Sequence, residues 1–132
     1  MKESEGQILI VDDDQDTRDL ITYVLGMNNY KTVAAENCDD AMMLALSHHF
    51  DLYLIDNWIA ECSGVGLSKQ LRKFDPLTPI LFYSGAAYER DKQQAFAAGA
   101  QGYLLKPVDN DELIEQVSQL ISAAKRTKHL TA

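Results

Sequence analysis

Short hydrophobic runs alternate with helix-like segments five times along the chain. The runs are nearly continuous, which is typical of parallel strands that are buried on both faces. Between them, hydrophobic residues recur with the period of an amphipathic helix. The pattern predicts strands at 8–11, 31–34, 52–55, 79–83 and 103–105, and helices at 16–27, 39–48, 67–74, 89–98 and 113–124.

A strand–helix unit repeated five times favours an α/β fold, a doubly wound parallel sheet with helices on both faces. Asp109 and Glu112 have the spacing of a capping pair at the start of the last helix. The 132 residues include no linker, repeat or low-complexity tract, so we expect one domain.

Composition narrows the class of protein further. No hydrophobic run reaches the roughly 18–20 residues that a membrane-spanning helix needs, and the N-terminus lacks a signal peptide pattern. The formal net charge of −8 argues against direct binding to nucleic acid, which depends on basic residues. We therefore expect a cytoplasmic protein that contacts neither membrane nor nucleic acid, with Cys38 and Cys62 as reduced, partly buried thiols.

Side chains capable of chemistry follow four of the predicted strands, at the point where each strand ends. In chain order these residues are Asp12, Asp13, Asp56, Ser84, Gly85 and Lys106. In an open parallel sheet, functional residues gather beyond the carboxyl ends of the strands, where the strand order reverses. We therefore expect these residues to meet at one edge of the sheet.

These residue types suit phosphoryl chemistry around a metal ion. Crowded carboxylates repel one another unless a cation joins them, and an open site of oxygen ligands suits Mg²⁺. A carboxylate can attack phosphorus to form an aspartyl phosphate. Lys106 would supply positive charge to the transferring group, Ser84 would supply a hydroxyl, and Gly85 leaves its backbone open to that group.

Four separated motifs resemble the receiver domain of two-component response regulators. They are ILIVDDD, DLYLID, PILFYSGA and GAQGYLLKPVD, and the resemblance covers about residues 7 to 124 in order. It implies a single receiver domain over residues 1–132. It also implies a (βα)5 flavodoxin-like sheet with strand order 2-1-3-4-5.

The resemblance also assigns roles to residues of the predicted site. Asp56 becomes the phosphoacceptor, and Mg²⁺, with Mn²⁺ able to replace it, is held by Asp12, Asp13, Asp56 and the backbone carbonyl of Trp58. Asp13 is the expected direct ligand of the acidic pair. Asp14 is assigned no metal role.

The remaining motif positions match residues that bind the phosphoryl group and transmit the signal. Ser84 and Tyr103 match the switch pair, Gly85 follows the switch serine, and Lys106 matches the lysine of the phosphoryl site. The Lys106–Pro107 bond resembles a cis peptide of the family.

The chain departs from the family pattern near the acceptor. Ala60 stands where members often have proline, which suggests a more mobile loop. Trp58 is bulky and Ala86 small at two positions where the family tunes water access and hence phosphoryl lifetime.

The function implied is a phosphorylatable switch. It would take a phosphoryl group from a sensor histidine kinase or histidine phosphotransfer protein and hydrolyse it slowly, without being a turnover enzyme. The signal would pass through the surface of helix 89–98, strand 103–105 and helix 113–124, to an output domain or protein or to a second copy in a homodimer. Because the first motif lies close to Met1, an output domain is expected on the C-terminal side.

Two alternatives keep part of this chemistry. A haloacid-dehalogenase-like phosphatase needs Asp-x-Asp-x-Thr, but Asp16 stands at the Thr position when the motif starts at Asp12, and Asp56 is left without a role. A pseudo-receiver binding module would keep the fold and lose phosphorylation. Whether Asp56 accepts phosphate discriminates the pseudo-receiver from the switch. Steady multiple-turnover hydrolysis of small phosphate esters would favour the phosphatase.

Overall fold

The five predicted hydrophobic runs form one parallel sheet. A computed structural model describes residues 4–85 and 88–131, so Ala86 lies outside the described residues. The strands are β1 (Gly6–Val11), β2 (Tyr30–Ala35), β3 (Leu52–Ile55), β6 (Ile80–Ser84) and β7 (Gly102–Leu105). Their order is β2-β1-β3-β6-β7, and every neighbouring pair is parallel. Because β6 and β7 are the fourth and fifth strands of this sheet, the predicted 2-1-3-4-5 order is confirmed.

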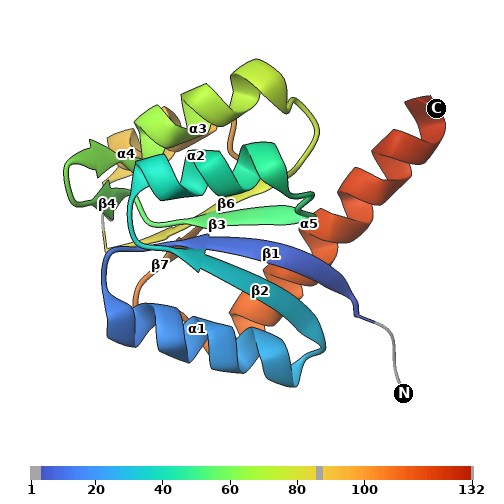
Figure 1. The fold of residues 1–132 in the computed structure, drawn as a ribbon, viewed down its shortest axis with the longest axis horizontal. Coiled ribbons are helices and arrows are strands. Elements are labelled where there is room, and N and C mark those ends of the chain that lie inside the picture. The colour runs from blue at the N-terminus through green and yellow to red at the C-terminus, as the bar shows by residue number, and fades with distance from the viewer. Residues whose placement is uncertain (1–3, 86–87, 132) are drawn as a thin grey trace.

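In the described part of the chain, four helices connect the strands and a fifth follows the last strand; together they cover both faces of the sheet. They are α1 (Gln15–Met27), α2 (Cys38–Ser47), α3 (Gly64–Phe74), α4 (Glu89–Ala97) and α5 (Asn110–Thr131). Figure 1 shows α2 and α3 above the sheet and α1 below it, with α5 extending beyond the sheet toward the C-terminus. The doubly wound α/β architecture is therefore confirmed.

Alternation along each strand divides the core into two layers. On β1, Leu9 and Val11 pack on the side of α2, α3 and α4, whereas Ile8 and Ile10 pack on the side of α1 and α5. All four side chains are fully buried. A strand buried on both faces has no polar face, which is why its sequence reads as a continuous hydrophobic run.

Polar side chains fix the starts of the helices. The carboxylate of Asp14 accepts the backbone N–H of Thr17 at 3.0 Å and its hydroxyl at 2.6 Å, and so caps α1. At the start of α5, the carboxylate of Asp109 accepts the backbone N–H of Glu112 at 3.3 Å, as a capping residue does.

A short hairpin between β3 and α3 was not predicted. Its strands are β4 (Trp58–Ile59) and β5 (Cys62–Ser63), which pair antiparallel, and Glu61 at the turn has a φ of 67°. Strands of two residues are too short to show a periodic pattern.

The prediction that Cys38 and Cys62 are reduced thiols is wrong: the structure joins them in a disulfide. The bond links the first residue of α2 to β5, across a sequence separation of 24 and a Cα–Cα distance of 6.4 Å. The pairing depends on how α2 and the hairpin meet in space, so spacing along the sequence did not reveal it. Both residues are half-buried, as expected.

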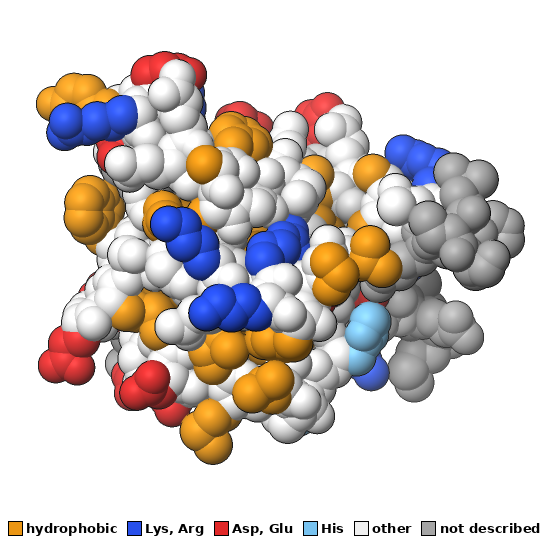
Figure 2. All heavy atoms as spheres, turned by 90° about the horizontal axis from the view of Figure 1, so that it is seen from above, with side chains coloured by type: hydrophobic (Ala, Val, Ile, Leu, Met, Phe, Trp, Pro, Cys, Tyr) orange, Lys and Arg blue, Asp and Glu red, His pale blue; other side chains and the backbone are white. Residues whose placement is uncertain are grey.

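The surface bears charges of both signs. Figure 2, which looks down on the α2 and α3 side, shows basic side chains near the middle with acidic and hydrophobic ones around them. Within the described part of the chain, no helix combines the length and the hydrophobicity that crossing a membrane would require.

Candidate functional site

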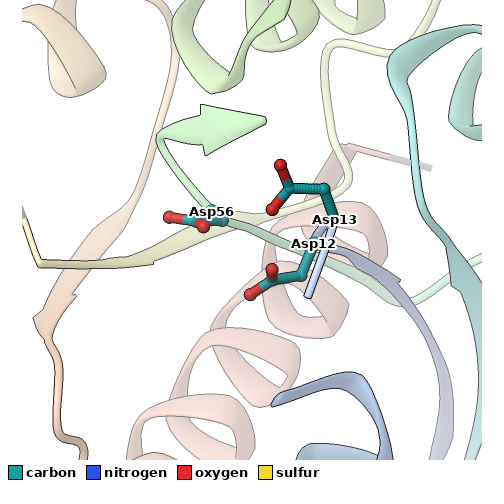
Figure 3. A group of neighbouring side chains, drawn as sticks. All are labelled: Asp12, Asp13 and Asp56. Atoms are coloured by element: carbon teal, nitrogen blue, oxygen red, sulfur yellow. The ribbon is translucent and has the colours of Figure 1, made fainter. Parts of the chain in front are cut away.

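Three aspartates meet at the carboxyl edge of the sheet. Asp12 and Asp13 directly follow β1, and Asp56 directly follows the neighbouring strand β3. The Asp56 N–H donates to the carbonyl of Val11 at 3.0 Å, which extends the β1–β3 pairing into the site. One oxygen from each carboxylate lies within 4.8 Å of the others, and Figure 3 shows the three side chains gathered around one space. Asp12 and Asp56 are buried, whereas Asp13 is exposed.

Lys106, which follows β7, brings an ammonium group to this cluster. Its Nζ lies 3.1 Å from Oδ2 of Asp12 and 3.3 Å from Oδ2 of Asp56. Burial lowers the pKa of Lys106, but the hydrogen bonds and charges of these two carboxylates outweigh it and hold the pKa above its ordinary value. Lys106 therefore stays protonated at neutral pH and can stabilise negative charge next to Asp56.

Tyr83 of β6 also belongs to the site, although its sequence position gave no sign of this. Its hydroxyl donates to Oδ2 of Asp12 at 2.7 Å, and its ring lies beneath Lys106 with 4.7 Å between Nζ and the ring centroid. The other Asp12 oxygen, Oδ1, accepts the N–H of Asp14 at 2.8 Å. Burial raises the pKa of Tyr83, and the charge of Asp12 adds to the rise, so Tyr83 remains a hydrogen-bond donor.

The environment of Asp56 favours pairing with positive charge. Burial raises the pKa of Asp56 above its ordinary value, and the charge of Asp12 acts in the same direction. Lys106 and the N–H of Trp58, which donates to Oδ1 at 3.3 Å, act in the opposite direction. Three carboxylates against one ammonium leave a surplus of negative charge and hard oxygen ligands, so the site could bind a divalent metal ion.

The remaining predicted residues lie at the ends of β6 and β7. Ser84 is fully buried, and its carbonyl accepts the N–H of Lys106 at 2.9 Å. Gly85 is exposed, and a Cβ built there would meet no atom within 4 Å, which leaves room for an incoming group. The Lys106–Pro107 peptide bond is cis.

Tyr103 of β7 packs against the core and also contacts Ser84. Its ring stacks on Phe82 of the neighbouring strand, with 6.0 Å between centroids and 6° between planes. Burial raises the pKa of Tyr103, while side-chain hydrogen bonds to Ser84 and Asn57 act to lower it. The side chains of Tyr103 and Ser84 are thus in direct contact.

The hairpin after Asp56 is attached to the acidic cluster. The N–H of Ala60 donates to Oδ2 of Asp13 at 2.9 Å. Proline, which the family often has at this position, has no N–H and could not form this bond. The side chain of Trp58 is 64% exposed beside the site. The absence of proline at Ala60 suggested a mobile loop. In the structure, the Ala60–Asp13 hydrogen bond and the Cys38–Cys62 disulfide restrain this loop.

The fold and the site together define a flavodoxin-like α/β domain with an acidic pocket at the point where strand order reverses. The model of one family, the response regulator receiver domain, matches residues 8–118. The chain belongs to this family of two-component signalling domains.

Similar proteins agree with this assignment. The transcriptional regulatory protein ResD of Bacillus subtilis is 32% identical over 98% of this chain, which spans 53% of ResD. The phosphate regulon transcriptional regulatory protein PhoB of Pseudomonas aeruginosa is 32% identical over 86% of this chain, which spans 51% of PhoB. The chain thus spans about half the length of these relatives.

Solved structures carry the same fold. The receiver domain of Francisella response regulator 1452 superposes with a TM-score of 0.84 and is 30% identical, with 93% of this chain and 99% of that chain covered. A CheY-like receiver domain from Methanospirillum hungatei gives a TM-score of 0.89 at 24% identity, over 96% of this chain and 99% of that one, and supports the fold alone.

Proposed function

We propose that this receiver domain is a phosphorylation switch in which Asp56 accepts the phosphoryl group. The observation that carries the proposal is the pairing of buried Asp56 with Lys106 at 3.3 Å, inside a cluster of three carboxylates. A carboxylate in this setting is held in place, and its surroundings compensate the charge that phosphorylation brings.

The chemical step is a transfer to a carboxylate oxygen. An Oδ of Asp56 forms a bond to phosphorus while the bond from phosphorus to the donor's imidazole nitrogen breaks. The electron pair leaves with the imidazole, which then takes a proton. Lys106 stabilises negative charge on the phosphoryl oxygens, the Ser84 hydroxyl can donate to one of them, and the backbone at Gly85 leaves space for them.

Asp12, Asp13 and Asp56, with the backbone carbonyl of Trp58, would hold Mg²⁺, and Mn²⁺ could replace it. The donor set fits, because it offers hard oxygen ligands with one exposed position at Asp13. When bound, the ion supplies positive charge that neutralises the carboxylates and the phosphoryl oxygens. Tyr83 and the N–H of Asp14 orient the Asp12 carboxylate independently of the ion.

Signalling would use the contact between Ser84 and Tyr103. When Ser84 turns toward a phosphoryl group, its hydrogen bond to Tyr103 changes, and Tyr103 lies on β7 between α4 and α5 in the chain. A population shift at this residue would remodel the α4–β7–α5 surface. Exposed Phe96 of α4 and Leu105 of β7 support this surface as the contact for an output partner or a second copy.

The donor would be a sensor histidine kinase or a histidine phosphotransfer protein. A surface hollow beside Lys106 is lined by Leu20 and Ile21 of α1 and by Pro107 and Val108. This hollow suits a hydrophobic helix that presents a phosphohistidine next to the acidic pocket. The output, as in the transcriptional regulators that the chain resembles, would lie in a further domain or partner.

The domain would act in the cytoplasm, with one phosphoryl transfer and slow hydrolysis per signalling event rather than turnover of a substrate. Nucleic acid would be bound by the output part and not by this acidic chain, whose net charge is −8. Neither the phosphatase nor the pseudo-receiver alternative gains support from the comparisons.

Trp58, the chain's one tryptophan, provides a direct test. Mg²⁺ should change its fluorescence saturably, and beryllofluoride should give a second change only when Mg²⁺ is present. Asp13→Ala should flatten the Mg²⁺ titration, while Asp16→Ala, at an exposed acid outside the cluster, should leave it unchanged. A beryllofluoride response that survives Asp56→Asn would contradict the proposal.

A further inference from the structure

The disulfide between Cys38 and Cys62 lies next to the acidic pocket and is not explained by the phosphorylation switch. It joins the start of α2 to the hairpin that begins two residues after Asp56. In the same hairpin, the N–H of Ala60 donates a hydrogen bond to the carboxylate of Asp13. A covalent bond at Cys62 therefore acts, through two residues of backbone, on a ligand of the proposed metal site.

Among the described residues, few other interactions hold this hairpin. Its ladder consists of two residue pairs, Trp58 with Ser63 and Ile59 with Cys62. An isolated two-stranded hairpin is at best marginally stable. Buried Ile59 and the bond from the Gly64 N–H to the Asn57 carbonyl at 3.0 Å add some restraint. The bond to α2 is the one covalent tie that fixes the hairpin against the layer of α2 and α3.

The bond is accessible to small molecules. Both cysteines line a surface hollow together with Asp39, Asp40 and Glu61, and both are half-buried. Cys38 is the first residue of α2, at the rim of this hollow. In a compartment that keeps thiols reduced, disulfides are mostly transient and redox-sensing.

We propose that Cys38 and Cys62 form a reversible dithiol–disulfide modification site that sets how firmly the acidic pocket binds its metal ion. This proposal rests on the proposed phosphorylation function. In the disulfide form, the hairpin is held where Ala60 can donate to Asp13. Reduction frees the hairpin, and the pocket must then order it again when it binds Mg²⁺.

The chemistry is a two-electron thiol–disulfide exchange with a small disulfide. The Cys38 thiolate attacks one sulfur of the reagent, whose other half leaves as a thiolate. The Cys62 thiolate then attacks Sγ of Cys38 and releases the second half. Overall, two protein thiols become one disulfide, one reagent disulfide becomes two thiols, and the two protons pass to those thiols.

The surrounding charge selects the reagent. Asp39, Asp40 and Glu61 repel anionic thiols such as glutathione and attract cationic ones. We therefore expect cystamine to form the disulfide faster than oxidised glutathione does, with a difference that shrinks as salt is added. The class of ligand is thus a small cationic or neutral disulfide or thiol.

The test compares the two redox states of the intact chain. Protein is oxidised with cystamine or reduced with dithiothreitol, freed of reagent, and checked by counting its thiols. Phosphorylation by acetyl phosphate is then followed by intact mass over a range of Mg²⁺ concentrations. The oxidised form should need about three- to tenfold less Mg²⁺ for half-maximal rate, because it does not pay the entropy of ordering the hairpin. The Trp58 titration should show the same shift.

A matched variant separates this effect from a general effect of the reagents. Cys38→Ser with Cys62→Ser should behave like the reduced form under both treatments. Equal Mg²⁺ dependence of the oxidised and reduced wild type would overturn the redox proposal and leave phosphorylation intact. Two free thiols after cystamine treatment would also overturn it. Absence of phosphorylation in every state would instead reject the phosphorylation function itself, and the redox proposal with it.

Discussion

Replacing Tyr83 with phenylalanine removes one hydroxyl from the centre of the site and little else. The hydroxyl donates to Oδ2 of Asp12 at 2.7 Å, and Asp12 is fully buried. The ring remains beneath Lys106, so the cation–π contact at 4.7 Å is kept. The variant therefore isolates the hydrogen bond to a buried carboxylate.

A hydrogen bond to a charged group contributes about 1.5–3 kcal/mol to folding. In Tyr83→Phe, Asp12 keeps its contacts with Lys106 at 3.1 Å and with the N–H of Asp14 at 2.8 Å. We therefore expect the free energy of unfolding to fall by about 2 kcal/mol, in the lower half of this range. With a urea m-value of about 2 kcal/mol/M, the unfolding midpoint should fall by about 1 M for Tyr83→Phe.

Urea unfolding without metal ion measures this directly. Tyr23→Phe is the matched control, because Tyr23 lies on α1 with its side chain 66% exposed and should change stability by less than about 0.5 kcal/mol. A midpoint for Tyr83→Phe within about 0.2 M of wild type, at unchanged m-value, would refute the view that this hydroxyl stabilises the Asp12 carboxylate.

Three further substitutions test the fold, one of them beside Asp56. Gly64→Ala should destabilise the protein by about 1–3 kcal/mol in urea unfolding, because the new Cβ would meet the carbonyl oxygen of Asp56 and lie 2.9 Å from Phe82. Gly26→Ala, with no atom within 4 Å of its Cβ, should instead raise the free energy of unfolding by about 0.5–1 kcal/mol, because alanine favours a helix more than glycine does. A lower free energy of unfolding for this variant would contradict the helical conformation of Gly26. Burial raises the pKa of Asp75, but four hydrogen bonds outweigh it and hold the pKa below the ordinary 3.8. The stability advantage of wild type over Asp75→Asn should therefore be complete above about pH 4 and vanish as pH falls through the lowered pKa, and an advantage that persists to about pH 1 would contradict this.

The sheet could be predicted because its strands are buried on both faces. The prediction for β3 matches the structure at both ends, and α1 begins within one residue of its predicted start. The hairpin could not be predicted, because two-residue strands carry no pattern and its position depends on Asp13 and the Cys38–Cys62 bond.

The sequence could predict those site residues that directly follow a strand, because parallel strands end at the same edge of the sheet. Asp12, Asp56 and Lys106 meet because β1, β3 and β7 end at the same edge of the sheet. Tyr83 was missed because it ends a hydrophobic run that predicts only a strand at 79–83. Its strand β6 is separated from β1 by β3, yet its hydroxyl donates to Asp12, which follows β1. The local sequence around Tyr83 cannot indicate such a contact between distant segments.

The residue that carries the phosphoryl group decides whether this domain is a phosphorylation switch at Asp56. Wild type, Asp56→Asn and Asp16→Asn are incubated with Mg²⁺ and acetyl phosphate and compared by intact mass. Asp16 is an exposed acid in the first turn of α1 and serves as the control. We expect one phosphoryl group on wild type and on Asp16→Asn, and none on Asp56→Asn. Undiminished labelling of Asp56→Asn, or an unlabelled wild type that still binds Mg²⁺, would contradict it.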